Sequence, residues 1–270
     1  MIGVFDSGIG GLSVLAAIAR ALPRSDLAYL ADTAHVPYGD KDDVYIRERV
    51  LRIGRYLVER QECRQIVVAC NTATAAAVAA LRESLPRIID VVGVEPGVKP
   101  AAAASKSGHI AVLATESTAR SERLARLIRQ HAGPVRVDIL PCPGWATKVE
   151  SLQLDDPDFA ETARRLLEPV LAVGADHIVL GCTHYAFLAP VLEPIVAGRA
   201  VLVDVADAVA RQCQRLAGGT DDEASDRRGS LTLLATAYPE RLSRALSVLG
   251  VLGQESFAAR LASPAILADV

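Results

Sequence analysis

Two cysteines stand in matching surroundings, one in each half of the chain. Cys70 lies in residues 66–72, Ile-Val-Val-Ala-Cys-Asn-Thr, and Cys182 lies in residues 178–184, Ile-Val-Leu-Gly-Cys-Thr-His. In both runs, apolar and small residues lead into the cysteine and two polar residues follow it. A thiolate accepts a proton and a thiol donates one. Two such groups on opposite faces of one carbon atom could remove a proton from one face and return a proton to the other, which inverts a stereocentre.

The same cysteines also have a simpler interpretation. A cysteine after an apolar strand is commonly a small buried hydrophobic residue. The matched contexts of Cys70 and Cys182 favour a function for both. Cys63 in a helix–strand link and Cys213 on a predicted helix are expected to be structural, and Cys142, between two prolines, could line the same cleft.

Each cysteine run predicts a buried parallel strand, a tight loop and the start of a helix. The first of these helices is predicted at residues 73–85, with Thr72 as a plausible N-cap. The second is predicted from about Ala186. Ligands of open α/β sheets bind beyond the carboxyl ends of the strands. Both cysteines are therefore expected at ligand-binding positions.

The chain as a whole predicts a duplicated α/β fold. Strands and helices alternate, and residues 2–7 can be laid loosely over residues 110–115, as the two cysteine runs can be laid over each other. The expected fold class is α/β, with two pseudo-symmetric doubly wound parallel-sheet domains and the active site in the cleft between them.

The expected domains are residues 1–96 plus 207–270, and residues 97–206. The boundary is placed where Glu95, Pro96 and Gly97 break a strand, with Pro100 following. A late strand at residues 231–235 is expected to return to the first domain, after an exposed loop at residues 218–228.

Composition excludes several classes of protein. Hydrophobic residues make up 51% of the 270 residues and aromatic residues 4%, which predicts a core of Ala, Val, Leu and Ile. The net charge of −3 argues against a nucleic-acid binder. No apolar run is long enough to span a membrane and no basic leader is visible, so a cytoplasmic location is expected. Five cysteines without a CxxC pair indicate reduced thiols and no structural zinc site.

Ionisable and small polar groups near the predicted strand ends could support proton transfer. Asp6 could assist near Cys70, and His184, two residues after Cys182, could assist on the other side, with Glu150 as its partner. The glycine-rich turn at residues 8–11 could leave N–H groups free for an anion. Candidate carboxylate-binding side chains are Ser7, Asn71, Thr72, Thr118 and Thr183. Tyr38 and Gly39 could offer a hydroxyl and a backbone N–H to a small ligand, although their spacing alone favours a purely structural turn.

Several motifs together resemble those of the glutamate racemases, in the cofactor-independent aspartate/glutamate racemase superfamily. They cover most of the chain and occur in the order of that family, at residues 4–12, 32–39, 69–74, 94–97, 115–121, 149–150, 181–185 and 204–207. The resemblance implies reversible conversion of L- and D-glutamate without a cofactor or metal, and a supply of D-glutamate for peptidoglycan. It implies a cytoplasmic enzyme, commonly a homodimer.

The resemblance also implies roles for individual residues. Cys70 and Cys182 correspond to the two catalytic acid/bases, with Asp6, Glu150 and His184 as assistants. The expected substrate contacts are Asp6, Ser7, Tyr38, Gly39, Asn71, Thr72, Thr118, Thr183 and His184. Three alternatives remain open: a racemase for aspartate or another acidic amino acid, a cysteine hydrolase built on Cys182 and His184, and a non-catalytic regulatory protein of the same fold.

Overall fold

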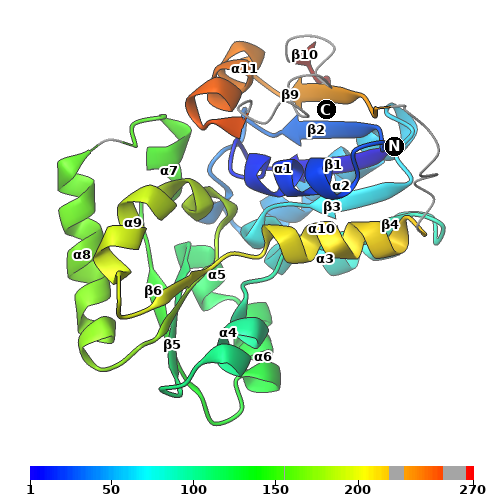
Figure 1. Cartoon of the computed structure of the whole chain (residues 1–270). Coiled ribbons are helices and arrows are strands. Elements are labelled where there is room, and N and C mark those ends of the chain that lie inside the picture. The colour runs from blue at the N-terminus through cyan, green and yellow to red at the C-terminus, as the bar shows by residue number, and fades with distance from the viewer. Residues whose placement is uncertain (155, 219–227, 252–265) are drawn as a thin grey trace.

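Two parallel sheets organise the protein. The computed structural model describes residues 1–154, 156–218, 228–251 and 266–270 (Figure 1). The first sheet has the order β10-β9-β2-β1-β3-β4 and the second the order β6-β5-β7-β8. The strands of the first are β1 (Ile2–Asp6), β2 (Leu27–Ala31), β3 (Gln65–Val68), β4 (Asp90–Gly93), β9 (Leu231–Ala235) and β10 (Ile266–Leu267). The strands of the second are β5 (His109–Ala114), β6 (Arg136–Pro141), β7 (His177–Leu180) and β8 (Val201–Val203).

The two sheets repeat one topology. When the strands of each sheet are numbered in chain order, β2-β1-β3-β4 and β6-β5-β7-β8 are the same arrangement. The register agrees as well, because Gly3 of β1 pairs with Ile66 of β3, and Ala111 of β5 pairs with Ile178 of β7. The overlay of residues 2–7 on 110–115 is therefore confirmed strand by strand, and so is the α/β fold class.

Helices cover both faces of each sheet, as a doubly wound fold requires. On the first sheet, Ile2 and Val4 of β1 face the core under α1 (Leu12–Ala21) and α10 (Ala206–Leu216), whereas Phe5 faces α2 (Asp43–Glu59) and α3 (Asn71–Ser84). The second sheet lies between α4 (Val98–Ala104) with α6 (Glu122–His131) and α8 (Pro157–Ala172) with α9 (Ala189–Val196). The remaining helices among the described residues are η1 (Tyr38–Asp40), α5 (Glu116–Arg120), α7 (Trp145–Glu150), η2 (Thr183–Leu188) and α11 (Pro239–Val248).

We call each sheet with its covering helices a lobe. The first lobe contains β9, which pairs with β2, so the late strand does return to the first sheet as predicted. The chain passes to the second lobe after β4 and returns after β8, and these two connections lie side by side (Figure 1). A Cβ atom at Gly97 would lie 3.0 Å from Val203 Cγ1 and 3.1 Å from Val205 Cγ1.

Some local expectations were wrong. Helix α3 begins at Asn71, because the Cys70 sulfur caps it in place of the Thr72 hydroxyl. Residues 98–104, for which the sequence suggests no helix, form α4 directly after the predicted break, since Pro100 falls in the first turn, where a backbone N–H has no helical partner. The predicted loop at residues 218–228 lies almost wholly outside the described residues. None of the described helices is long and apolar enough to cross a membrane.

Candidate active site

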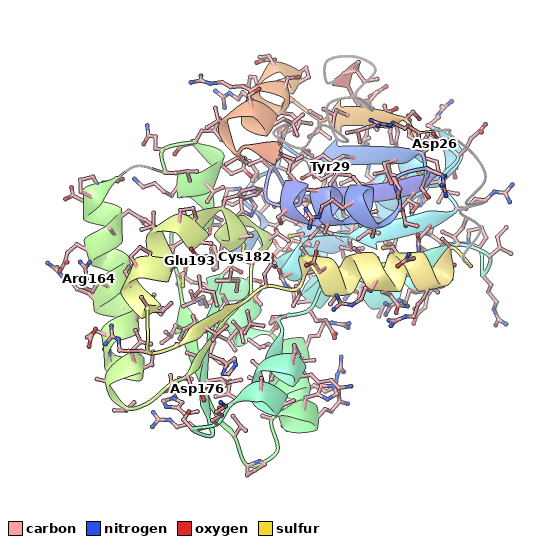
Figure 2. All side chains as sticks on the ribbon, viewed as in Figure 1. Asp26, Tyr29, Arg164, Asp176, Cys182 and Glu193 are labelled. Atoms are coloured by element: carbon pink, nitrogen blue, oxygen red, sulfur yellow. The ribbon has the colours of Figure 1, made fainter. Side chains whose placement is uncertain are left out.

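Cys70 and Cys182 line one narrow cavity of about 40 Å³ between the lobes. Each stands two residues beyond the end of its strand, β3 for Cys70 and β7 for Cys182, and these strands occupy equivalent places in the two sheets. Figure 2 shows Cys182 where the lobes meet, with Tyr29 inside the first lobe and Arg164 and Asp176 on the outer parts of the second. The cavity is also lined by Ser7, Tyr38, Gly39, Thr72, Thr115, Cys142 and His184.

Cys70 has a carboxylate and a helix start as neighbours. Its sulfur lies 3.9 Å from Ser7 Oγ and accepts a hydrogen bond of 3.4 Å from the Ala73 N–H. Ser7 in turn donates to Asp6 Oδ1 at 2.9 Å. Burial raises the pKa of the Cys70 thiol, and the charge of Asp6 raises it further, whereas the Ala73 N–H acts in the opposite direction. The surroundings of Cys70 therefore favour the protonated thiol.

Cys182 has an imidazole as its neighbour. The sulfur lies 3.6 Å from His184 Nδ1, and His184 Nε2 donates to Glu150 Oε1 at 2.6 Å. Burial alone would lower the pKa of His184, but its hydrogen bonds to Cys182 and Glu150 outweigh burial and hold that pKa well above its usual range. A protonated imidazole offers the Cys182 thiolate both a hydrogen bond and a positive charge.

Contacts between the lobes complete both sites. Thr183 of the second lobe donates to Asp6 Oδ2 at 2.8 Å, and the Ile9 N–H of the first lobe donates to Glu150 Oε1 at 2.8 Å. Burial raises the pKa of Asp6, against the opposing influence of His184, Thr183 and Ser7. The glycine turn, residues 8–11, thus directs its Ile9 N–H to a carboxylate of the protein itself, where the sequence suggested a free anion site.

Tyr38 reaches the cavity, but its hydroxyl is engaged elsewhere. It donates to Asp32 Oδ2 at 2.5 Å, and Arg49 holds both oxygens of the same carboxylate at 3.0 and 2.8 Å. All three side chains are buried. The sequence suggested that this hydroxyl binds a ligand, but in the structure it binds Asp32. It thereby holds in place the loop in which Gly39 lines the cavity.

Threonines connect the two lobes beside Cys70. Thr72 Oγ1 lies 3.1 Å from Thr115 Oγ1 and 3.2 Å from Thr118 Oγ1. Thr115 lines the cavity, and Thr118 supports it from behind. The sequence places Thr115 only within a polar turn, yet its overlay on Ser7 in the internal repeat is a usable signal for a site residue.

Five predicted site residues lie behind the cavity wall. Asp6, Asn71, Thr118 and Thr183 are buried, and Glu150 borders a neighbouring cavity. Among the described side chains, the Asn71 amide is unusual because neither Oδ1 nor Nδ2 has a hydrogen-bond partner. Within the described part of the chain, no three His, Cys, Asp or Glu side chains are grouped so that they could hold a metal ion.

The family of this chain follows from comparison with known proteins. The Asp/Glu/Hydantoin racemase family matches residues 2–213. The chain belongs to that family. Among the members of this racemase family, the glutamate racemase of Pseudomonas aeruginosa strain UCBPP-PA14 is 46% identical over 248 residues, which are 92% of this chain and 93% of that protein.

Solved structures of racemases agree with the fold. The Escherichia coli glutamate racemase in complex with L-glutamate and the activator UDP-MurNAc-ala superposes with a TM-score of 0.80 at 32% identity, covering 92% of this chain and 94% of that one. The glutamate racemase isoform RacE1 from Bacillus anthracis gives a TM-score of 0.82 at 26% identity, covering 100% and 97%. The geometry described above thus belongs to a racemase fold over nearly its full length.

Proposed function

We propose that this protein is a glutamate racemase that interconverts L- and D-glutamate by deprotonation and reprotonation at the α carbon. The observation that carries the proposal is the pair of cysteines that line one cavity from equivalent positions of two repeated lobes. A reaction that treats two mirror-image molecules alike needs one proton acceptor and one donor on opposite faces of the same carbon. The relatives named glutamate racemase support glutamate as the substrate.

The proton steps follow from the two neighbourhoods. For one enantiomer, the thiolate of one cysteine accepts the α proton, and the thiol of the other donates a proton to the opposite face. The bond to the first hydrogen breaks as a carbanion forms, and a new carbon–hydrogen bond consumes that electron pair. Each turnover exchanges the protonation states of the two cysteines. In this mechanism Cys70 and Cys182 are the catalytic acid/bases, and Asp6, His184 and Glu150 assist them.

Substrate binding is assigned to small polar groups around the cysteines. Ser7, Gly39 and Thr72 line the cavity directly, and Tyr38, Thr118 and Thr183 hold the wall. The unpartnered amide of Asn71 lies next to Cys70 but behind the cavity wall. We propose that the wall opens when substrate binds, so that the amide gains hydrogen bonds to a substrate carboxylate or ammonium, which would remove the cost of its burial. We also propose domain limits of 1–96 plus 207–270 and 97–206, a cytoplasmic homodimer, and a supply of D-glutamate to peptidoglycan synthesis.

One observation favours a second function. Cys182, His184 and Glu150 form a sulfur–imidazole–carboxylate relay of the kind that cysteine hydrolases use. A hydrolase, however, needs only one nucleophile, so a hydrolase mechanism gives no role to Cys70, which lines the same cavity from the equivalent position of the other lobe. The relay is therefore assigned to proton transfer.

Proton NMR in D₂O tests the function. Purified protein is incubated separately with L-glutamate, D-glutamate and L-aspartate, while polarimetry follows the optical rotation. The proposal predicts loss of the Cα–H signal from both glutamate enantiomers and decay of rotation to zero. Exchange with aspartate alone would move the assignment to an aspartate racemase. If neither amino acid exchanges, the racemase proposal is wrong, and assays of amide and ester hydrolysis would then test the relay.

A further inference from the structure

The glycine turn of the first lobe closes tightly around two side chains of the second. A Cβ atom at Gly8 would lie 1.9 Å from Glu150 Oε1, and one at Gly10 would lie 2.3 Å from His184 Nδ1. Neither glycine has the positive φ angle that disfavours other residues. What these positions require is the absence of a side chain, because the space is occupied by Glu150 and His184.

The turn also binds what it surrounds. The Ile9 N–H donates to Glu150 Oε1, the same oxygen that receives the His184 proton. The Gly8 carbonyl accepts a hydrogen bond of 2.6 Å from the buried Tyr29 hydroxyl, which fixes the turn to the first sheet. The carboxylate is thus held between a rigid backbone of one lobe and the imidazole of the other.

Gly11, the last glycine of the turn, packs against Asp6, which lies beside Cys70. A Cβ atom at Gly11 would lie 2.8 Å from Asp6 Cβ and 3.0 Å from both Asp6 Oδ2 and the Tyr29 hydroxyl. One turn therefore leaves room for His184 and Glu150 beside Cys182, and separately for Asp6 beside Cys70.

We propose that Gly8, Ile9 and Gly10 are positioning residues for proton transfer at Cys182, because they hold Glu150 and His184 against it from across the cleft. Gly11 is the corresponding positioning residue for Asp6 at Cys70. This inference rests on the proposed racemase function. A methyl group at Gly8 would displace the flexible end of Glu150 by more than an ångström while the strands and helices stay in place, since only that carboxylate stands within 3 Å.

Initial exchange of the α proton in D₂O, measured separately for L- and D-glutamate, tests the proposal. Each cysteine removes the proton of one enantiomer, so Cys182→Ser and Cys70→Ser define which enantiomer depends on which cysteine. Gly8→Ala and Gly10→Ala should slow exchange of the enantiomer that depends on Cys182 by about a hundredfold, as expected for a misplacement of this size. Exchange of the other enantiomer should fall much less. Gly11→Ala should show the opposite preference.

Gly54→Ala is the matched control. Its Cβ atom would lie 2.4 Å from Leu81 Cδ1, a clash of similar size with the end of a buried side chain. Leu81 lies eleven residues after Cys70 along α3, or roughly 16 Å along the helix axis. Gly54→Ala should change the exchange rates of L- and D-glutamate by the same factor. Equal loss for both enantiomers in Gly8→Ala and Gly10→Ala would overturn the proposal, while absence of exchange in the wild type would instead overturn the racemase function.

A readout independent of turnover uses the imidazole itself. In Gly8→Ala the His184 ring should lose its bond to Glu150 and remain buried, so its pKa should fall. NMR titration of the His184 ring resonances measures this fall in the substrate-free protein. An unchanged His184 titration in Gly8→Ala would contradict the positioning role even if activity is lost.

Discussion

The two cysteine loops have the same backbone plan and opposite electrostatic surroundings. Where the first lobe has Asp6 at the end of β1, the second has Ala114 at the end of β5. Where the first has Thr72 two residues after its cysteine, the second has His184. One thiol thus has a carboxylate nearby and the other an imidazole. Repetition supplies two sulfur atoms at symmetric positions, and the departures from repetition give them different neighbours for proton transfer.

The helices that follow the two cysteines also differ, because only one of them donates a backbone hydrogen bond to its cysteine sulfur. Cys70 caps α3, a helix of 14 residues, and its sulfur accepts the Ala73 N–H. Cys182 precedes the 3₁₀ helix η2 and receives no such capping bond from the described residues. A thiolate at Cys70 is therefore stabilised by backbone, and a thiolate at Cys182 by His184. The comparison predicts that the two sites respond to different substitutions.

The largest effect should come from the cysteines themselves. Cys70→Ser and Cys182→Ser each replace a thiol by a hydroxyl that ionises far less readily and is a weaker proton donor, so racemisation should fall roughly a hundred- to ten-thousandfold. Polarimetry measures the loss. Each variant should still exchange the α proton of one enantiomer, and the two should retain opposite enantiomers. Wild-type racemisation by either variant would show that the two-base assignment is wrong.

An intermediate effect should appear in stability against pH. Because the pKa of His184 is raised in the folded protein, its contribution to stability is complete below pH 6.5 and is lost as pH rises through the folded pKa. The free energy of unfolding should therefore fall above about pH 6.5, by at most about 1.4 kcal/mol per pH unit from this group.

Urea unfolding between pH 6 and pH 9 measures that slope. His184→Asn should flatten it, whereas His131→Asn, at an exposed position at the end of α6, should not. A slope that His184→Asn leaves intact would show that another group is responsible. Urea unfolding of Asp6→Asn over the same pH range would then test whether the carboxylate beside Cys70 is that group.

The smallest effect should come from a third cysteine in the same cavity. Cys142 lines the wall, and its sulfur lies 3.3 Å from the Leu140 carbonyl. Burial raises its pKa to about 12. The equivalent position in the first lobe, one residue after β2, is Asp32, so the first lobe has no matching cysteine there. Cys142→Ala should racemise glutamate at close to the wild-type rate and lose about 1 kcal/mol of stability. Loss of activity comparable to that of Cys70→Ser would break the two-cysteine comparison.

The sequence predicted the parts of the fold that depend on local pattern. Apolar runs predicted the main strands. The two cysteine runs predicted one shared cavity, because each cysteine follows the carboxyl end of its strand and β3 and β7 occupy equivalent places in the two sheets. The pair of His184 and Glu150 was also predicted, and the structure brings their atoms within 2.6 Å.

Features that depend on contacts between distant residues were not predictable. Nothing local indicates that Thr183 donates to Asp6 or that the Ile9 N–H donates to Glu150, since these pairs are 177 and 141 residues apart. Short helices such as α7 carry too few turns for an apolar period to show. The cap of α3 was missed because hydroxyl and carboxylate side chains are the usual caps, and here a sulfur atom takes that place.

The two connections between the lobes have a mechanical consequence. They pass side by side, so that Gly97 on one nearly touches Val203 and Val205 on the other. Two adjacent connections restrict sliding and twisting of one lobe against the other far more than they restrict rotation of the lobes about the line that joins the connections. We therefore expect relative motion of the lobes to be chiefly a rotation about the line of the two connections. A substitution at Gly97, which is part of neither cysteine loop, should then change the distance between the two sulfur atoms.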